Sequence, residues 1–87
     1  MKPFKYYSDS GHGWLAVKRS FLVSIGILDK ITRFSYQRGK TVYLEEDCDV
    51  TTFVEAYKKA YGVEPKFIHS YVNGNSSIRR YEHFKVD

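Results

Sequence analysis

The chain has 87 residues, of which 43% are hydrophobic, 17% aromatic and 28% charged, and its formal net charge at pH 7 is +4. A chain of this length buries enough apolar surface for one core, which excludes a two-domain architecture, so we expect a single domain over residues 1–87. Its eight tyrosines, six phenylalanines and one tryptophan argue against disorder. The only cysteine, Cys48, excludes an internal disulfide and a cysteine-based zinc site, and it favours a reducing, cytoplasmic setting.

Membrane insertion and secretion are not expected from this sequence. No apolar run approaches the roughly 18–20 residues that a membrane span requires. The N-terminus leads into aromatic residues, where a signal peptide would have its apolar region. The sequence therefore predicts a soluble, intracellular protein with no membrane partner.

Two strands and a short helix are predicted in the first 26 residues. Residues 3–8 alternate with a period of two, and a glycine-rich loop separates them from the compact apolar run 14–17; both patterns are typical of strands. Within residues 18–26 the apolar side chains have helical spacing, and Gly26 suits the left-handed position after a helix. A strand stays open as the alternative there because of the β-branched residues.

The middle of the chain predicts a hairpin followed by a longer helix. Residues 31–37 and 41–45 are rich in strand-forming side chains, and Gly39 between them can supply the positive φ of a tight turn. Residues 50–61 carry apolar side chains at helical spacing, with acidic residues before them, lysines near their end and Gly62 after the last turn.

A second hairpin is predicted at the C-terminus. Residues 66–72 lead into Asn73 and Gly74, a pair that favours a tight hairpin turn, and residues 77–84 can return as the partner strand. The whole order predicts an α+β fold: a single small domain with a mainly antiparallel sheet of about five to six strands and two helices.

The acidic stretch before the longer helix is the densest charge in the chain. Its carboxylates could form a Mg²⁺ or Ca²⁺ site, but the spacing of an EF-hand loop is absent, and no metal site or cofactor is predicted. We expect Asp47 or Asp49 to cap the helix N-terminus, with the remaining acids facing its positive end or a basic partner. We interpret Cys48 as a buried small side chain whose thiol pKa is raised by the neighbouring acids.

Two further groups of side chains could carry chemistry. His12, near Asp9 and Ser10, could shuttle protons from a mobile loop, but an ordinary turn with His12 exposed or packed on Trp14 is favoured. In the C-terminal hairpin, cations lie among phenol and imidazole groups, which could hold nucleic acid, serve a small ribonuclease, or solvate a packed strand. The residues concerned are Lys66, His69, Arg79, Arg80, Tyr81, His83 and Lys85.

Three segments carry a resemblance to a known family: residues 11–17, 35–49 and 77–81. In these segments, and over nearly its whole length, the chain resembles a family of small, uncharacterised proteins encoded by bacteriophages and bacterial plasmids. That family has no assigned activity, so the resemblance implies no catalytic residues. It implies a bacterial host and favours accessory proteins that act by binding, including inhibitors of host defence of the anti-CRISPR or anti-restriction type.

The leading hypothesis is therefore a non-enzymatic protein that binds a host protein or ribonucleoprotein complex in the bacterial cytoplasm and obstructs it. Tyrosine and arginine are common in interface hot spots. The predicted contacts are Tyr36, Arg38, Lys40, Tyr43, Glu45, Glu46, Asp47, Arg79, Arg80 and Tyr81. The alternatives are direct nucleic-acid binding by the basic C-terminal hairpin and, third, a small ribonuclease. Edge strands in so small a sheet also leave a homodimer open.

Overall fold

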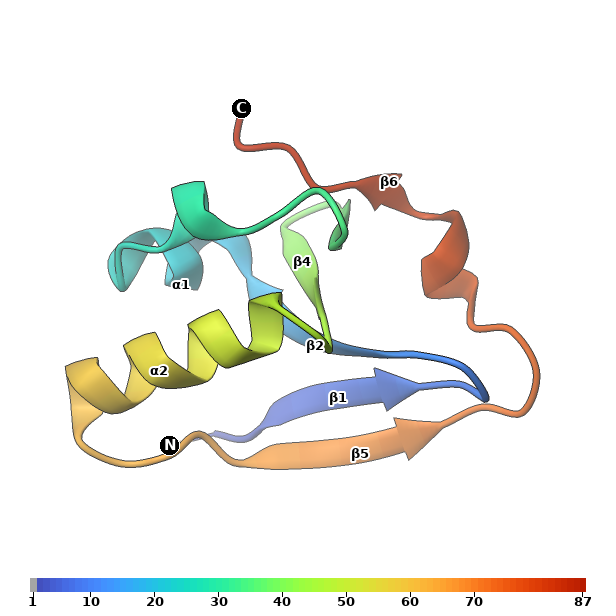
Figure 1. The fold of residues 1–87 in the computed structure, drawn as a ribbon, viewed down its shortest axis with the longest axis horizontal. Coiled ribbons are helices and arrows are strands. Elements are labelled where there is room, and N and C mark those ends of the chain that lie inside the picture. The colour runs from blue at the N-terminus through green and yellow to red at the C-terminus, as the bar shows by residue number, and fades with distance from the viewer. Residues whose placement is uncertain (1) are drawn as a thin grey trace.

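The computed structural model describes residues 2–87, and it contains six strands and two α-helices (Figure 1). The strands are β1 (Phe4–Ser8), β2 (Gly13–Lys18), β3 (Tyr36–Arg38), β4 (Thr41–Glu45), β5 (Phe67–Tyr71) and β6 (Glu82–His83). The helices are α1 (Arg19–Ser24) and α2 (Asp49–Tyr61), with single 3₁₀ turns η1 (Leu28–Lys30) and η2 (Ser77–Arg80). This arrangement confirms the predicted α+β class.

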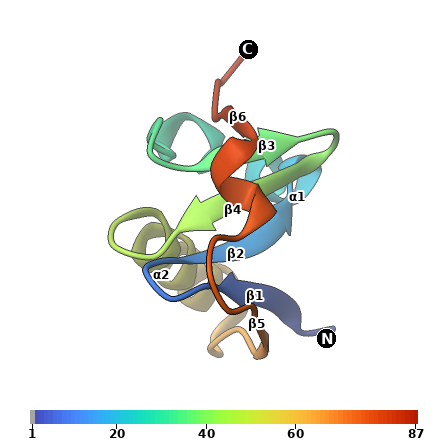
Figure 2. The same cartoon turned by 90° about the vertical axis from the view of Figure 1, so that its right-hand side faces the viewer.

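The six strands form one mixed sheet in the order β5-β1-β2-β4-β3-β6. Every neighbouring pair is antiparallel except β1 and β5, which are parallel. The last two strands therefore lie at opposite edges of the sheet, and the chain between them crosses the sheet through η2 (Figure 2).

The predicted C-terminal hairpin is wrong. Residues 66–72 do extend as a strand, but that strand pairs with β1, and the expected return strand 77–84 is a 3₁₀ turn followed by two residues paired to β3. A buried carboxylate directs this path, because Asp9 Oδ2 accepts a hydrogen bond from the Ser76 N–H at 2.8 Å. The Ser76 hydroxyl then accepts from the Ile78 N–H, and the Ile78 side chain is buried.

The central hairpin is confirmed, although its first strand is shorter than predicted. Gly39 has the expected positive φ of 59° in the turn between β3 and β4. Residues 31–35 are not part of the strand, because the side chains of Thr32 and Ser35 turn toward Asp49 and donate hydrogen bonds to its carboxylate. Local β propensity is overridden there by a buried polar contact.

Both predicted helices form, and each predicted glycine lies within two residues of the end of its helix. Gly26 and Gly62 have φ values of 76° and 75°, and the Gly62 N–H donates to the Lys58 carbonyl at 2.8 Å, so each glycine supplies the left-handed residue that closes a helix. Among the described residues, neither helix has the length and apolar character needed to cross a membrane.

The core lies between the helices and one face of the sheet. Leu15 and Val17 of β2 and Val42 and Leu44 of β4 pack there with Phe53 and other helix residues, all buried. Because side chains alternate along a strand, the residues between these positions point to the opposite face, which we call the outer face. The outer face carries Lys5, Tyr7, Trp14, Ala16, Lys18, Tyr36, Arg38, Thr41, Tyr43 and Glu45.

Candidate interaction surface

Strand pairing arranges the outer face in three rows that run across the sheet. Lys18, Thr41 and Arg38 are register partners in the first row. The second row runs through Lys5, Ala16, Tyr43 and Tyr36, and the third through Tyr7, Trp14 and Glu45. The face is therefore basic at one end, aromatic in the middle and acidic at the other end.

Aromatic rings link these rows into one surface. The ring centroids of Tyr43 and Tyr7 lie 6.3 Å apart, and those of Tyr43 and Tyr81 lie 5.1 Å apart. Trp14 and Tyr36 meet edge to face at 6.3 Å, within the range of favourable ring pairs. Trp14 is buried, whereas the four tyrosines are half-buried, so their rings are held by neighbours and still reach solvent.

The basic end forms a shallow cavity of about 470 Å³. Lys5, Tyr7, Lys18 and Tyr43 are among the residues that line it, and both lysines are exposed. Nearby, the Arg38 guanidinium lies 5.1 Å from the centre of the Tyr81 ring and donates a hydrogen bond to its hydroxyl at 3.3 Å. Hydrogen bonds from Ser77 and Arg38 lower the pKa of Tyr81 below its usual value.

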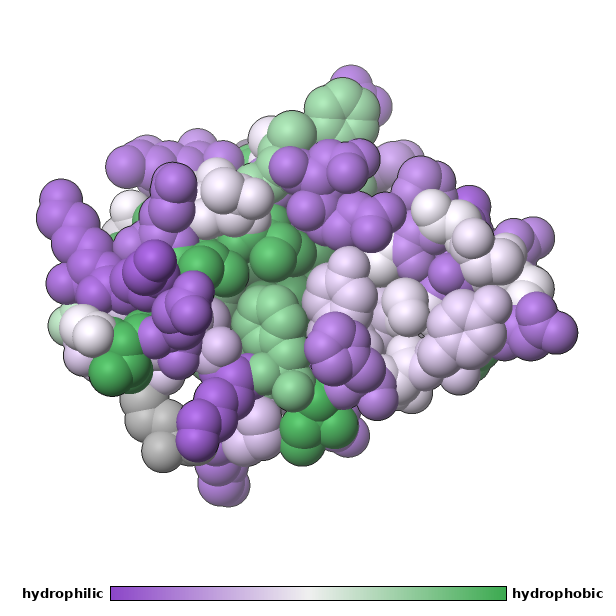
Figure 3. Space-filling view, turned by 60° about the horizontal axis from the view of Figure 1, so that its bottom comes forward, coloured by the Kyte–Doolittle hydropathy of each residue, from purple (hydrophilic) through white to green (hydrophobic). Residues whose placement is uncertain are grey.

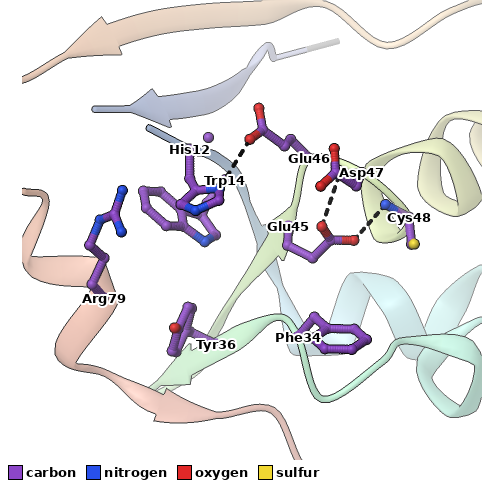
Figure 4. A pocket seen from close by; sticks show the side chains of 10 residues that line it. His12, Trp14, Phe34, Tyr36, Glu45, Glu46, Asp47, Cys48 and Arg79 are labelled. Atoms are coloured by element: carbon purple, nitrogen blue, oxygen red, sulfur yellow. Dashed lines mark hydrogen bonds and ion pairs between the residues drawn. The ribbon is translucent and has the colours of Figure 1, made fainter. Parts of the chain in front are cut away.

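The acidic end forms a second cavity, of about 350 Å³, between the loop 9–13 and the start of α2 (Figure 4). Carboxylates stand on one side of it, Arg79 stands on the other, and aromatic rings lie between them (Figure 4). Phe34, which is 67% exposed, lies at its rim. The lining residues are His12, Gly13, Trp14, Phe34, Tyr36, Glu45, Glu46, Asp47, Cys48 and Arg79.

Glu45 caps α2, and the predicted caps do not. Its Oε1 accepts from the N–H groups of Cys48 at 2.5 Å and Asp49 at 2.9 Å, and its Oε2 accepts from the Asp47 N–H at 2.8 Å. One carboxylate thereby satisfies backbone donors that would otherwise be free at the helix N-terminus. The prediction of Asp47 or Asp49 as the cap is wrong, because Asp49 points into the protein.

Asp49 ties the start of α2 to the loop before β3. It is 1% exposed, and its Oδ2 accepts from the Thr32 N–H at 3.0 Å, from the Thr32 hydroxyl at 2.8 Å and from the buried Ser35 hydroxyl. The Ser35 oxygen in turn accepts from the Glu45 N–H at 2.9 Å. The acidic wall of the cavity is therefore anchored from behind.

Two carboxylates of that wall differ in their availability. Glu46 Oε1 lies 3.4 Å from His12 Nδ1, and its Oε2 accepts from the Tyr6 hydroxyl at 3.4 Å. Burial, with the charge of Glu46 as a smaller cause, raises the pKa of Tyr6. Within residues 2–87, the Asp47 carboxylate makes no hydrogen bond or ion pair, so it is free to meet a partner's cation.

The opposite wall is held by an ion pair that local sequence patterns did not reveal. Asp9 Oδ2 accepts from Arg79 Nε at 2.6 Å and Oδ1 from Nη2 at 2.9 Å, although the residues are 70 positions apart. Oδ1 also accepts from the N–H groups of Gly11 and His12, as in the predicted turn. The Arg79 guanidinium, itself 5.7 Å from the Trp14 ring centre, holds the pKa of Asp9 far below its usual range.

The structure brings together most of the predicted partner contacts. Tyr36, Arg38, Tyr43 and Tyr81 share the outer face, and Glu45, Glu46, Asp47 and Arg79 line its acidic cavity. Lys40 is exposed in the β3–β4 turn and Arg80 is exposed on η2. Sequence patterns did not identify Lys5, Tyr7 and Trp14 as contacts, because the strands that bring them beside the central hairpin are joined only in the folded sheet.

The predicted nucleic-acid and ribonuclease residues do not form one site. Lys66 and His69 belong to the β5 edge, whereas His83 and Lys85 lie at the β6 edge. The His83 ring stacks on Tyr36 at 4.9 Å and its Nδ1 lies 2.9 Å from the Arg33 carbonyl oxygen. Lys85 pairs with Glu82 at 3.0 Å. The basic hairpin on which both hypotheses depended is therefore absent.

Cys48 is exposed at the acidic cavity, so the prediction of a buried side chain is wrong. The charge of Glu45, followed by burial and the charges of Asp49 and Asp47, raises the pKa of the thiol, in the predicted direction.

No group of three or more histidine, cysteine, aspartate or glutamate side chains in residues 2–87 is placed to hold a metal ion. Comparison of the chain with family models, curated proteins and solved structures finds no match.

Proposed function

We propose that this chain is a non-enzymatic binding protein that attaches to a host protein or ribonucleoprotein complex through its outer face and obstructs it. One observation carries the proposal: the outer face joins a basic row, a cluster of tyrosines and an acidic cavity on adjacent strands. Tyrosine, tryptophan and arginine are the residue types that dominate interface hot spots.

The distribution of charge favours a protein surface as the contact. Nucleic acid presents phosphates along its whole length, so a surface built for it carries positive charge along the whole path. Here Glu46 and Asp47 stand at one end of the face and Lys18 and Arg38 at the other. A protein surface that offers acidic groups, apolar groups and a cation in the same order complements this pattern.

The site is also preorganised, which suits obstruction by binding. Glu45, Asp49 and Asp9 fix both walls of the acidic cavity through hydrogen bonds to backbone N–H groups. A surface that is ordered before association loses less conformational entropy when it binds. A small domain of this kind can block a larger complex without a catalytic group.

The test is affinity capture from a bacterial host lysate, with the bound proteins quantified by mass spectrometry. The Lys18→Glu/Arg38→Glu double variant reverses the charge of two exposed side chains in the basic row. We expect it to lose the captured complex, because a hot-spot side chain contributes about 2 kcal/mol or more, roughly thirty-fold in affinity. Adding the wild-type chain to the same host complex, free of the chain, should then inhibit the activity of that complex.

The matched control is Lys58→Glu/Lys59→Glu, which makes the same charge change on exposed residues of α2, away from the outer face. It should retain the partner. Equal capture by both double variants, or no protein above background, would contradict the proposal. Tight binding of single-stranded RNA or DNA that weakens steeply with salt would instead identify nucleic acid as the partner.

A further inference from the structure

The β5 strand leaves one long edge of the sheet unpaired. It is aligned with β1 over five consecutive register pairs, from Phe4 with Phe67 to Ser8 with Tyr71. In the part of the chain that the structure describes, no segment pairs with its other side. The opposite edge is β6, which has only two residues and offers little backbone to a second strand.

Two backbone hydrogen bonds of the parallel ladder establish which groups of β5 point away from the sheet. The Phe4 N–H donates to the Lys66 carbonyl at 2.8 Å, and the Val72 N–H donates to the Ser8 carbonyl at 3.0 Å. Since alternate residues of a strand face the same neighbour, Ile68 and Ser70 also bond to β1. The N–H and C=O groups of Phe67, His69 and Tyr71 therefore point outward.

Nothing in β5 protects this edge. Exposed strands usually avoid pairing by means of proline, a bulge or a charged side chain, and β5 has the sequence Phe-Ile-His-Ser-Tyr in uninterrupted register. Ile68 is 53% exposed and Tyr71 is 62% exposed. The side of the molecule that carries β5 shows hydrophobic side chains in its middle, bordered by hydrophilic ones (Figure 3).

The strand is complementary to a second copy of itself. In an antiparallel pair with a two-fold axis at His69, Phe67 lies opposite the partner's Tyr71, and Ile68 lies opposite the partner's Ser70. All outward N–H and C=O groups of the three residues then find partners, because these residues occupy the hydrogen-bonded positions. The pairing sets aromatic rings opposite each other and brings no like-charged lysine or carboxylate pair face to face.

We propose that two copies of this chain associate through antiparallel pairing of β5 with β5, which joins their sheets into one. The two-fold axis is perpendicular to the sheet at His69, so the outer faces of both copies lie on the same side of the joined sheet. The dimer thereby presents two copies of the interaction surface to one partner. The association itself depends only on β5, so it can be tested separately from the proposed function.

The first test is sedimentation velocity of the purified full chain from low micromolar to near-millimolar concentration. The expected result is a reversible shift from the monomer mass to twice that mass. His69→Pro should abolish the shift, because the outward N–H is lost while the bonds to β1 remain. His69→Ala is the matched control and should still dimerise, since the backbone makes the contact; circular dichroism checks that both variants fold.

The second test needs no proline in the strand. In a Cys48→Ser background, His69→Cys places two thiols beside the two-fold axis, where the Cα atoms of such a pair are about 5.5 Å apart and within disulfide range. It should cross-link under mild oxidation several-fold faster than Thr51→Cys, an exposed position on α2. A monomer mass at every concentration would overturn the proposal, and so would equal cross-linking at both positions. These results are also the ones expected if β5 pairs only with a different protein, so that case would overturn the proposal as well.

Discussion

At the scale of single residues, Asp9 links two parts of the chain that are far apart in the sequence. Its two oxygens accept hydrogen bonds from the loop that follows β1 and from Arg79 and Ser76, near the other end of the chain. The carboxylate is buried, so its negative charge is stabilised by these donors in place of water. The contact requires Asp9 to be ionised.

We therefore predict acid sensitivity that depends on Asp9. Because the pKa of this carboxyl is lower in the folded than in the unfolded chain, the ion pair stabilises the fold above the unfolded pKa of about 3.9, and that stabilisation is lost as pH falls below it. Asp9→Asn should lower the Tm by several degrees near neutral pH, and the gap should narrow toward about pH 2. Thermal unfolding followed by circular dichroism across this range measures both effects.

The control for this prediction is Asp47→Asn, which removes an exposed carboxylate that makes no ion pair among the described residues. Its Tm curve should follow that of the wild type. If the gap between Asp9→Asn and the wild type were constant over the whole pH range, the ionised Asp9 would not be the source of the stability.

At the scale of elements, the start of α2 combines a structural cap with an exposed thiol. Glu45 accepts from three consecutive backbone N–H groups, and its charge is the largest cause of the raised pKa of Cys48. The same carboxylate thus caps the helix and raises the pKa of the thiol. The sequence predicted the charge effect on Cys48, but Glu45, four residues before the first residue of the helix, was not recognised as its cap.

We predict that Glu45→Gln makes Cys48 more reactive. The thiol pKa should fall, so a larger fraction is thiolate near neutral pH, and alkylation by iodoacetamide should become several-fold faster. Because the charged cap is lost, the free energy of unfolding should also fall by about 1 kcal/mol. Reaction rates followed by intact mass spectrometry, together with urea unfolding, measure the two effects.

Glu46→Gln is the matched control, because Glu46 is not a cause of the Cys48 shift and makes no contact with the helix N-terminus. Its alkylation rate should equal that of the wild type. Equal acceleration by both variants would mean that the general negative charge of the turn, and not the Glu45 contact, controls the thiol.

At the scale of the whole molecule, the C-terminal segment closes the fold. After β5 the chain crosses the sheet, and Phe84 joins the main core at 5% exposure, while its N–H donates to the Ser35 carbonyl at 2.9 Å. The Arg19 guanidinium lies 5.4 Å from the centre of the Phe84 ring. Phe84 therefore packs against the first residue of α1 as well as against the core.

We predict that Phe84→Ala destabilises the entire domain by about 3–5 kcal/mol, the usual cost of removing a buried phenylalanine ring. Urea unfolding should still show a single transition at a lower midpoint. Val86→Ala, two residues later and 49% exposed, should change stability by less than about 0.5 kcal/mol. A separate early transition for the C-terminal segment would show that it is not part of the cooperative core.

The sequence by itself determined the features that depend on neighbouring residues. The apolar spacing and Gly62 placed α2, Gly39 placed the central turn, and the order of the predicted elements indicated the α+β class. The same patterns identified Tyr36, Arg38 and Tyr43 as candidate contacts, because one hairpin carries all three. These signals come from residues that are close in the sequence, and the helix and the turn that they predicted are present in the structure.

Only the tertiary structure decided where β5 and the C-terminal segment go. The sequence of residues 66–84 suits a local hairpin, but strand backbone groups bond equally well to any available edge, and here β1 provides that edge. Asp9 then holds Ser76 and Arg79 on the far side of the loop, a contact across some 70 residues that no local pattern encodes. The outer face, with Lys5, Tyr7 and Lys18 beside the central hairpin, exists only because of this strand order.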